Sequence, residues 1–288
     1  MKSMQSISDL ASSGFVYVAN TPAYVLEAQS SMFSLRLHNP AVKVALVAPE
    51  NLWPQAQGFD VYVELDLDDR TPIVKLDARK APFDRVCFLD TDTRVTGDMS
   101  EAFALLDRFD LCLAHEPTRG WDYGISVPPA FCELNTGVIF FRKTAKVLSF
   151  FDTWLAWYRA VLSEQGLRND QPAFRRALWE TEDIDVWVLP SEFHSIVGKP
   201  VAIAWEARLL HGRVNLARVE QLINAKMGCR TYVPGVGCLS AFDGRKGLLR
   251  DWLRLTIRYF VLLIRQNDSP EMGTKQAVPH RWHLGETE

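Results

Sequence analysis

The chain has 288 residues, of which 48% are hydrophobic and 23% are charged. This composition is typical of a globular protein and excludes a disordered or fibrous chain. The formal net charge is only −3, since 32 Lys and Arg face 35 Asp and Glu. A near-neutral chain lacks the broad positive charge of nucleic-acid-binding proteins, so we expect no nucleic-acid partner and a local site for any anionic ligand.

The cysteines and the apolar segments bear on the cellular location. The five cysteines are widely spaced and form no C-x-x-C pair, which argues against a disulfide scaffold or a zinc module and favours a reducing compartment. The N-terminal residues lack the apolar run of a signal peptide. No stretch reaches the roughly 18 apolar residues of a membrane-spanning helix. We therefore predict a cytoplasmic protein.

Apolar runs rich in β-branched and aromatic residues predict buried strands in the first part of the chain. The first strand is expected at residues 15–19, followed by a helix that begins near Pro22 and ends at Asn39. Residues 42–47 predict a second strand and residues 61–63 a third. Strands that alternate with helix-length segments are typical of βαβ units around a largely parallel sheet.

The middle of the chain continues this alternation. A helix is expected around residues 73–78, and an apolar strand follows at residues 85–89. Two more strands, a helix with aromatic residues at helical spacing and a last strand come next. They are expected at residues 111–114, 137–141, 147–162 and 186–189, in that order.

The character of the sequence changes near residue 235, where several glycines surround a linker. We predict a core domain over residues 10–235 and an appendage over residues 236–288. The appendage would contain the linker, a basic amphipathic helix and a polar tail. Its helix, residues 248–264, places three arginines at helical spacing beside apolar side chains. Such a helix could lie peripherally on an anionic membrane, pack against the core, or contact a second subunit.

Asp90 and Asp92 stand directly after the apolar strand at residues 85–89. Ligand sites in open α/β sheets lie outside the carboxyl ends of the strands. Two carboxylates this close repel each other unless they share a cation or a proton. Carboxylate oxygens suit Mg²⁺ or Mn²⁺, which commonly bridge protein carboxylates and substrate phosphates. The pair therefore predicts a divalent-cation site, with two solvated turn residues as the alternative.

Two enzyme classes place such a pair at the end of a strand. The sequence FLDTDT at residues 88–93 fits the D-x-D-x-T pattern of haloacid-dehalogenase-type phosphotransferases. Those enzymes normally open their fold with this strand, whereas three predicted strands precede it here. In the second class, the GT-A glycosyltransferases, the pair holds the metal that bridges the diphosphate of a nucleotide sugar.

Five motifs follow one another between residues 15 and 215. They are FVYVANTPAY at 15–24, DRVCFLDTDTRVTGD at 84–98, LNTGVIFFR at 134–142, NDQ at 169–171 and VLPSEF at 188–193. In this order they resemble the nucleoside-binding loop, metal-binding segment, donor-sugar strand, Asp-Gln pair and following segment of retaining glycosyltransferases of the family 8 kind. The resemblance implies an α/β GT-A domain with a mixed, mostly parallel central sheet flanked by helices, plus the C-terminal helical appendage.

The resemblance implies a metal ion, usually Mn²⁺ with Mg²⁺ as the alternative, held by Asp90, Asp92 and His211. The Gly-x-x-Lys-Pro-Trp element that usually follows the histidine in this family is absent after His211. Arg213 or Arg218 could replace its Lys on the diphosphate, because a guanidinium pairs well with phosphate oxygens.

The resemblance also implies contacts to the donor. Lys75, with Asp77 or Arg79 as a neighbour, would contact the donor phosphate or sugar, and Asn135 would hold sugar hydroxyls. A solvated lysine and a strand-entry turn residue are the alternatives at positions 75 and 135. The other substrate-binding candidates are Ala19, Asn20, Thr21, Tyr24, Thr91, Thr136, Gly137 and Arg213.

Asp170 and Gln171 are the candidate catalytic residues, although capping of a helix would also explain Asp170. The implied reaction is metal-dependent transfer of a hexose, with retention, from a nucleotide diphosphate sugar, foremost a UDP-sugar, to a hydroxyl of a glycan, lipid-linked or protein acceptor. Alternatives are a phosphatase with Asp90 as its nucleophile and an inactive nucleotide-sugar-binding module. The loop between Glu116 and Phe131, rich in Gly, Pro and aromatic residues, is the first candidate for the acceptor site.

Overall fold

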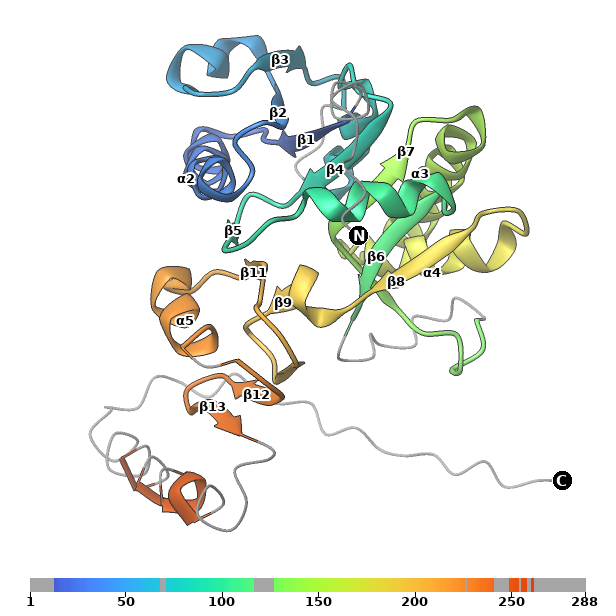
Figure 1. Cartoon of the computed structure of the whole chain (residues 1–288). Coiled ribbons are helices and arrows are strands. Elements are labelled where there is room, and N and C mark those ends of the chain that lie inside the picture. Colours follow the sequence, from blue (N-terminus) through green and yellow to red (C-terminus); the bar gives the residue numbers. More distant parts are fainter. Residues whose placement is uncertain are drawn as a thin grey trace, which may run out of the picture. The chain divides into compact units, whose positions relative to one another are not determined.

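The computed structural model describes residues 13–67, 71–116, 127–225, 227–240, 249–253, 255–257 and 260–261. The chain divides into two compact units, Met1–Phe242 and Asp243–Glu288. Figure 1 labels most of the helices and strands of the first unit. Within the described ranges, no helix combines the length and the apolar character that a membrane span requires.

A seven-strand sheet forms the centre of the first unit. Its strands are β1 (Ser13–Val18), β2 (Lys43–Ala48), β3 (Val61–Glu64), β4 (Arg85–Leu89), β6 (Leu111–His115), β7 (Leu134–Arg142) and β8 (Val186–Leu189). They lie in the order β3-β2-β1-β4-β7-β6-β8. The first four are parallel, β7 is antiparallel to both of its neighbours, and β8 is parallel to β6. The predicted mixed, mostly parallel sheet is confirmed.

Both faces of this sheet are buried. In β1, Phe15 and Tyr17 belong to one apolar cluster, while Val16 and Val18 belong to the cluster on the opposite face. Strands buried on both faces are apolar at every position rather than at every second one. This is why the inner strands of the sheet could be predicted from uninterrupted apolar runs, whereas the edge strands β3 and β8 are partly exposed.

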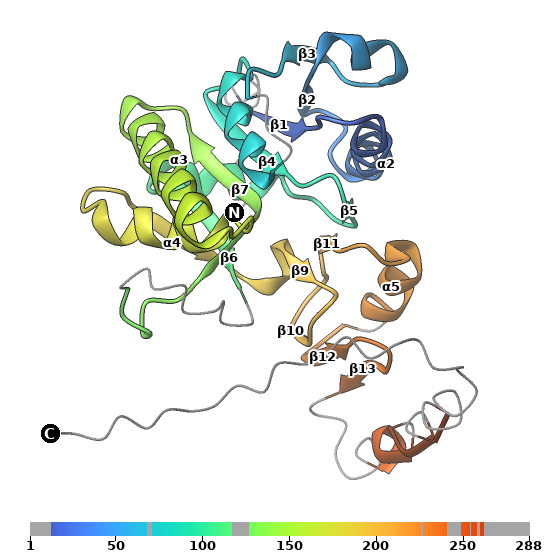
Figure 2. The same cartoon turned by 180° about the vertical axis from the view of Figure 1, so that it is seen from behind.

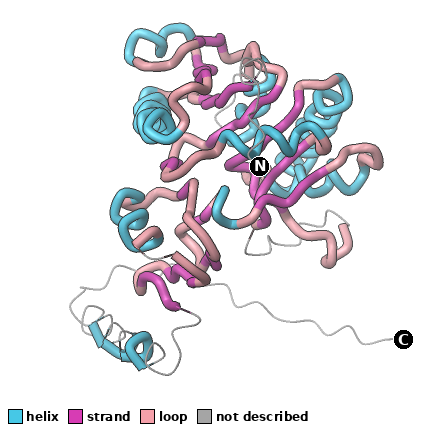
Figure 3. Tube along the Cα trace, in the orientation of Figure 1, coloured by secondary structure: helices cyan, strands magenta, loops and turns pink. Residues whose placement is uncertain are grey.

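Helices cover both faces, as Figure 3 shows. One face packs against α2 (Pro22–His38) and the 3₁₀-helices η1 (Glu50–Gln55) and η3 (Ser100–Asp107). The other packs against the 3₁₀-helix η2 (Pro72–Lys80) and two α-helices, α3 (Ala145–Gln165) and α4 (Gln171–Glu180), which lie side by side in Figure 2.

Local sequence explains where the long helices begin and end. Thr21 accepts a hydrogen bond from the Tyr24 amide at the start of α2, and Thr144 accepts one from the Val147 amide at the start of α3. α3 ends at Gly166, whose φ of +64° is a left-handed conformation that glycine adopts without strain. The helix expected around residues 73–78 is also found, but as the 3₁₀-helix η2.

Two small sheets were not predicted. One has the order β5-β11-β9, and the other has the order β10-β12-β13 and packs beside a short helix. Their strands are β5 (Thr93–Val95), β9 (Ser195–Ile196), β10 (Val201–Ile203), β11 (Leu209–His211), β12 (Arg230–Val233) and β13 (Gly237–Ser240), and the helix is α5 (Leu216–Ile223). Strands of two to four residues are too short to show a hydrophobic period.

The linker prediction needs one correction. Residues 237–240, which the sequence assigns to a linker, form β13 and pair with β12. Gly235 and Gly237, with φ of +76° and +106°, allow the tight turn that joins the two strands. The division of the chain at residue 235 into core and appendage stays a prediction.

The second unit contains helical residues at 249–253, 255–257 and 260–261. Several large apolar side chains there are exposed. They are Leu249, Trp252, Leu253, Leu255, Ile257, Phe260 and Val261. The contact predicted for residues 248–264, with a membrane or a second subunit, stays a prediction.

Candidate functional site

A cavity of about 290 Å³ opens at the carboxyl ends of β1 and β4. β1 and β4 are parallel, so they end together, with Tyr17 opposite Leu89. β7 runs the other way, which places its first residues beside the end of β4, with Val138 opposite Leu89. Residues from three strands that are distant in the sequence therefore meet at one edge of the sheet.

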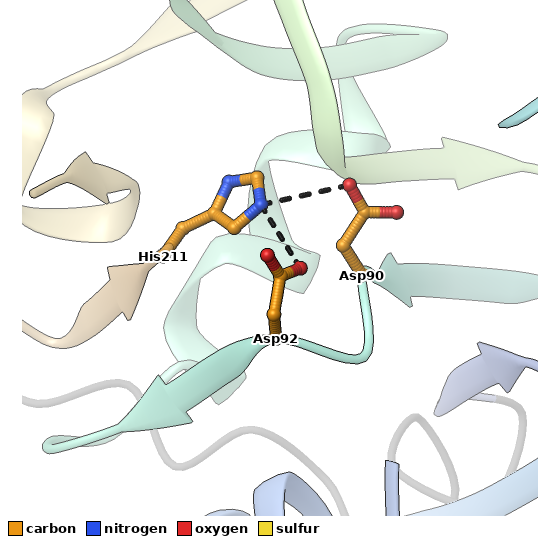
Figure 4. A group of neighbouring side chains, drawn as sticks. All are labelled: Asp90, Asp92 and His211. Carbon is orange, nitrogen blue, oxygen red and sulfur yellow. Dashed lines mark ion pairs between the residues drawn. The ribbon is translucent and has the colours of Figure 1, made fainter. Parts of the chain in front are cut away.

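Asp90, Asp92 and His211 form an acidic cluster at this edge, shown in Figure 4. His211 Nε2 lies 3.3 Å from Asp92 Oδ1 and 3.7 Å from Asp90 Oδ2. One potential ligand atom of each residue lies within 4.8 Å of the others. β11 brings His211 to this place because it pairs with β5, which sets His211 opposite Thr93.

The three pKa values respond to this proximity. Burial raises the pKa of Asp90 above its usual value, against the opposing effect of Lys75 and His211. Burial would also raise the pKa of Asp92, but the hydrogen bond from His211 lowers it. For His211, burial would lower the pKa, yet the hydrogen bond to Asp92 and the charge of Asp90 raise it. The cluster favours positive charge, and two carboxylates with one imidazole are a donor set that fits a divalent cation.

Lys75 is buried beside this cluster, with only 7% of its surface exposed. Its Nζ lies 3.1 Å from Asp170 Oδ2 and 3.8 Å from Asp90 Oδ1, and it donates to the Thr136 carbonyl at 3.1 Å. Burial would lower the pKa of Lys75, but Asp170 and Asp90 raise it. Lys75 is therefore a buried cation with two carboxylate partners, and the alternative of a solvated lysine is wrong.

Asp170 occupies the N-cap position of α4, but its side chain makes no capping hydrogen bond. Its carboxylate instead accepts a hydrogen bond from Thr136 Oγ1 at 2.9 Å and pairs with Lys75. Capping therefore does not explain this residue. Its carboxylate forms its contacts inside the cavity and does not cap the helix.

The two neighbours suggested for Lys75 do not line the cavity. Asp77 accepts hydrogen bonds from the backbone amides of Asp66 and Leu67. Arg79 forms an ion pair with Asp152 at 2.7 Å. Both side chains thus connect η2 to neighbouring segments of the chain and do not face the cavity.

Glu116 joins several predicted residues and was not itself predicted as a site residue. Its Oε2 accepts from Asn135 Nδ2 at 2.7 Å and from Gln171 Nε2 at 3.1 Å, and its other oxygen pairs with Lys199. The side-chain oxygen of Asn135, Oδ1, accepts from the Gly137 backbone amide at 2.8 Å. Asn135 is thus held at both ends of its amide. The only signal in the sequence was an acidic residue just after a predicted strand.

Arg213 lies at another wall of the cavity. Its guanidinium pairs with Glu27, stands 5.3 Å over the Tyr24 ring, and has Nε 3.6 Å from Asp92 Oδ2. Glu27 also accepts from Thr91 Oγ1 at 2.8 Å, and it too was not predicted as a site residue. Arg218, the other candidate for the missing lysine, is exposed and does not line the cavity.

Besides Asp77, Arg79 and Arg218, only Ala19 and Thr21 among the predicted site residues do not line the cavity. The Ala19 amide donates to the Val47 carbonyl, which continues the pairing of β1 with β2, and Thr21 caps α2. Of the loop proposed for the acceptor, residues 117–126 lie outside the described residues.

Gly137 lies directly against the acidic cluster, which gives a first prediction. A Cβ at this position would lie 2.5 Å from His211 Cε1 and 2.9 Å from Asp90 Oδ2. Gly137→Ala must therefore displace a cluster residue, and we expect it to weaken Mn²⁺ binding by about ten- to a hundredfold, measured by isothermal titration calorimetry. Gly198→Ala is the matched control, because its added Cβ meets no atom within 4 Å. Native affinity in Gly137→Ala would contradict the prediction.

No protein-family model and no curated protein matches the sequence. Solved structures do match it. The glycosyltransferase GlyE from Streptococcus pneumoniae TIGR4 is 18% identical with a TM-score of 0.51, over 70% of this chain and 54% of GlyE. The galactosyltransferase LgtC, solved in complex with donor and acceptor sugar analogues, is 14% identical with a TM-score of 0.51, over 70% of this chain and 87% of LgtC.

The chain spans about half of the length of GlyE. At such low identities the likeness establishes the fold. The resemblance predicted from the sequence motifs is confirmed at this level: the chain has the GT-A fold, which it shares with the glycosyltransferases GlyE and LgtC.

Proposed function

We propose that the protein is a metal-dependent glycosyltransferase that moves a hexose from a nucleotide diphosphate sugar to an acceptor hydroxyl, with retention of configuration. One observation carries the proposal: a GT-A fold places Asp90, Asp92 and His211 in the same cavity as Asp170 and Gln171. A UDP-sugar is the proposed donor, and a glycan, lipid-linked or protein hydroxyl is the proposed acceptor. The proposed location is the cytoplasm.

The acidic cluster would hold Mn²⁺ or Mg²⁺. A cation there supplies a Lewis acid for the negative charge that develops on a departing diphosphate. Lys75 and Arg213 add positive charge at two other walls of the cavity, where they would bind or orient the phosphates. Arg213 is the better candidate for the missing lysine, because Arg218 does not line the cavity.

The uncharged walls suit the rest of the donor. Asn20 and Tyr24 lie just after β1 and would hold the nucleoside, with the Tyr24 ring exposed enough to contact a base. Asn135 and Gln171 present amides that Glu116 holds in place, close to where the sugar would lie. The Asp170 carboxylate is buried against Lys75. We therefore propose that Asp170 orients the side chains of this wall and does not attack the sugar.

The alternatives have less support. A phosphatase of the dehalogenase type would use Asp90 as its nucleophile, but the matching folds are those of glycosyltransferases. An inactive binding module would bind a donor without turnover, and the Asp-Asp-His cluster gives no reason to expect a dead site.

A thermal-shift screen of UDP-, GDP- and ADP-linked sugars, with and without Mn²⁺, tests the donor site. A ligand at a hundred times its Kd stabilises the native state by about 2.7 kcal/mol. For a domain of this size that corresponds to a rise in Tm of about 5–10 °C. We expect one nucleotide sugar to give this rise, and only with the metal. If no nucleotide sugar raises Tm under any metal condition, the proposal is wrong.

Two arginines provide the control for this screen. Arg213→Ala should lose most of the rise in Tm, because its guanidinium lies in the cavity. Arg218→Ala removes the same charge from a nearby exposed position and should keep the rise. Equal effects of the two substitutions would mean that Arg213 contributes only general positive charge.

A further inference from the structure

His194 lies directly behind the metal-ligand candidate His211, at the junction of η4 (Ser191–Phe193) and β9. Only 2% of its surface is exposed. Its ring lies edge to edge with that of His211, with centroids 5.0 Å apart and an interplanar angle of 25°. His194 Nε2 lies 2.8 Å from His211 Nδ1, which is a hydrogen-bond distance.

Other contacts fix the His211 ring further. Gly137 approaches it so closely that a Cβ would lie 2.5 Å from His211 Cε1. On its remaining side, His211 Nε2 points at the carboxylates of Asp90 and Asp92 (Figure 4). The two nitrogens of His211 therefore face different partners: Nε2 faces the acidic cluster and Nδ1 faces His194.

This arrangement determines where the His211 proton must be when Nε2 binds a cation. A nitrogen that binds a metal uses its lone pair, so the proton of a neutral imidazole is then on the other nitrogen. That nitrogen is His211 Nδ1, and the acceptor within reach is His194 Nε2. A ligating histidine whose second nitrogen donates in this way is fixed in tautomer and in ring orientation.

The other nitrogen of the His194 ring, Nδ1, has an unfavourable environment. If Nε2 accepts from His211, the His194 proton is on Nδ1. That atom is buried and has no hydrogen-bond partner among the described residues. A buried polar atom without a partner destabilises a fold, so such atoms call for an explanation in a native structure. Packing alone would be served better by an apolar side chain at this position.

We propose that His194 is a positioning residue for the metal site: when a cation is bound, His194 Nε2 accepts the Nδ1 proton of His211, which holds the His211 ring with its Nε2 lone pair towards the cation beside Asp90 and Asp92. The inference rests on the metal site of the proposed function. It adds a residue that lies outside the five sequence motifs and does not line the cavity.

Calorimetric titration of Mn²⁺ into three proteins tests the proposal. His194→Leu keeps an apolar side chain in the space but removes the acceptor, and we expect Mn²⁺ affinity to fall about ten- to a hundredfold. His194→Gln carries an amide oxygen at about the reach of Nε2, and its affinity should stay within about threefold of the native value. Unchanged affinity in His194→Leu, or an equal loss in both variants, would overturn the proposal.

A measurement on the native protein covers the case in which a variant fails to fold. Nitrogen-15 NMR of the histidine rings, recorded with Zn²⁺ as a diamagnetic ion that imidazole binds well, should show the His211 proton on Nδ1. A proton on His211 Nε2 in the Zn²⁺ form would overturn the proposal. If the native protein binds neither Mn²⁺ nor Zn²⁺, the metal site itself is wrong, whereas native binding with an indifferent His194 removes only this inference.

Discussion

Lys75→Met is expected to lower the free energy of unfolding by about 3–5 kcal/mol, because removal of one member of a buried ion pair leaves the other charge without compensation. Asp170 is only 3% exposed, and its carboxylate lies 3.1 Å from Lys75 Nζ. The second partner, Asp90, lies 3.8 Å from the same nitrogen and already has a raised pKa. Methionine fills a similar space, so the loss comes from the charge rather than from a cavity.

Urea unfolding followed by circular dichroism measures this loss, and the Tm should fall by about 10 °C. The double variant Lys75→Met, Asp170→Asn should recover most of the stability, because it removes both charges of the closest pair. Lys43→Met is the matched control. Its ion pair with Asp60 is 3.3 Å long but the lysine side chain is 61% exposed, so we expect a loss below about 1 kcal/mol. If Lys75→Met also lost less than about 1 kcal/mol, other groups would compensate the buried carboxylates and the prediction would be wrong.

Asp92→Asn is expected to eliminate Mn²⁺-dependent donor binding and to lower sugar transfer by about a hundred- to a thousandfold. The substitution keeps the shape of the side chain but removes one of two anionic ligands from the Asp-Asp-His cluster. The stability should change by no more than about 1 kcal/mol, because the weaker hydrogen bond to His211 is offset by relief of the repulsion from Asp90.

Titration of Mn²⁺, together with an assay of sugar release and transfer from the donor found in the screen, checks this expectation. Asp107→Asn is the control, since Asp107 pairs with Arg85 at the surface and its side chain is 57% exposed. It should leave both binding and transfer unchanged. Full transfer by Asp92→Asn in the presence of a chelator would contradict a role for a metal ion at this cluster.

The residues before and after each core strand show how far sequence alone could go at the site. Asp90 and Asp92 follow β4 directly, and a carboxylate at a strand end is visible as a local pattern. Tyr24 and Asn135 were found through motifs that include a core strand, and Lys75 was suggested by the family resemblance. Their shared place in one cavity follows from the parallel register of β1 and β4 and the reversed direction of β7.

Glu27, Glu116 and His194 were not predicted from the sequence. Each acts through a partner that is distant in the sequence: Arg213 for Glu27, Asn135 and Gln171 for Glu116, and His211 for His194. Glu27 and His194 belong to no sequence motif, and Glu116 had only its place after a predicted strand as a signal. The role of each residue depends on a partner that folding brings beside it. Asp170 is a similar case. From the sequence, capping of α4 was a reasonable explanation, but its actual partner is Lys75 of η2, which is distant in the sequence.

The sequence by itself determined the α/β fold, the strands of the central sheet and the acidic pair at the end of β4, because uninterrupted apolar runs and carboxylates at a strand end are local patterns. The resemblance named His211 as the third metal ligand, but only the tertiary structure decided how it comes to lie beside the acidic pair. His211 reaches Asp92 through the pairing of β11 with β5, two strands of three residues each that were not predicted. Strands that short carry no hydrophobic period, and their pairing is set by packing between segments far apart in the chain.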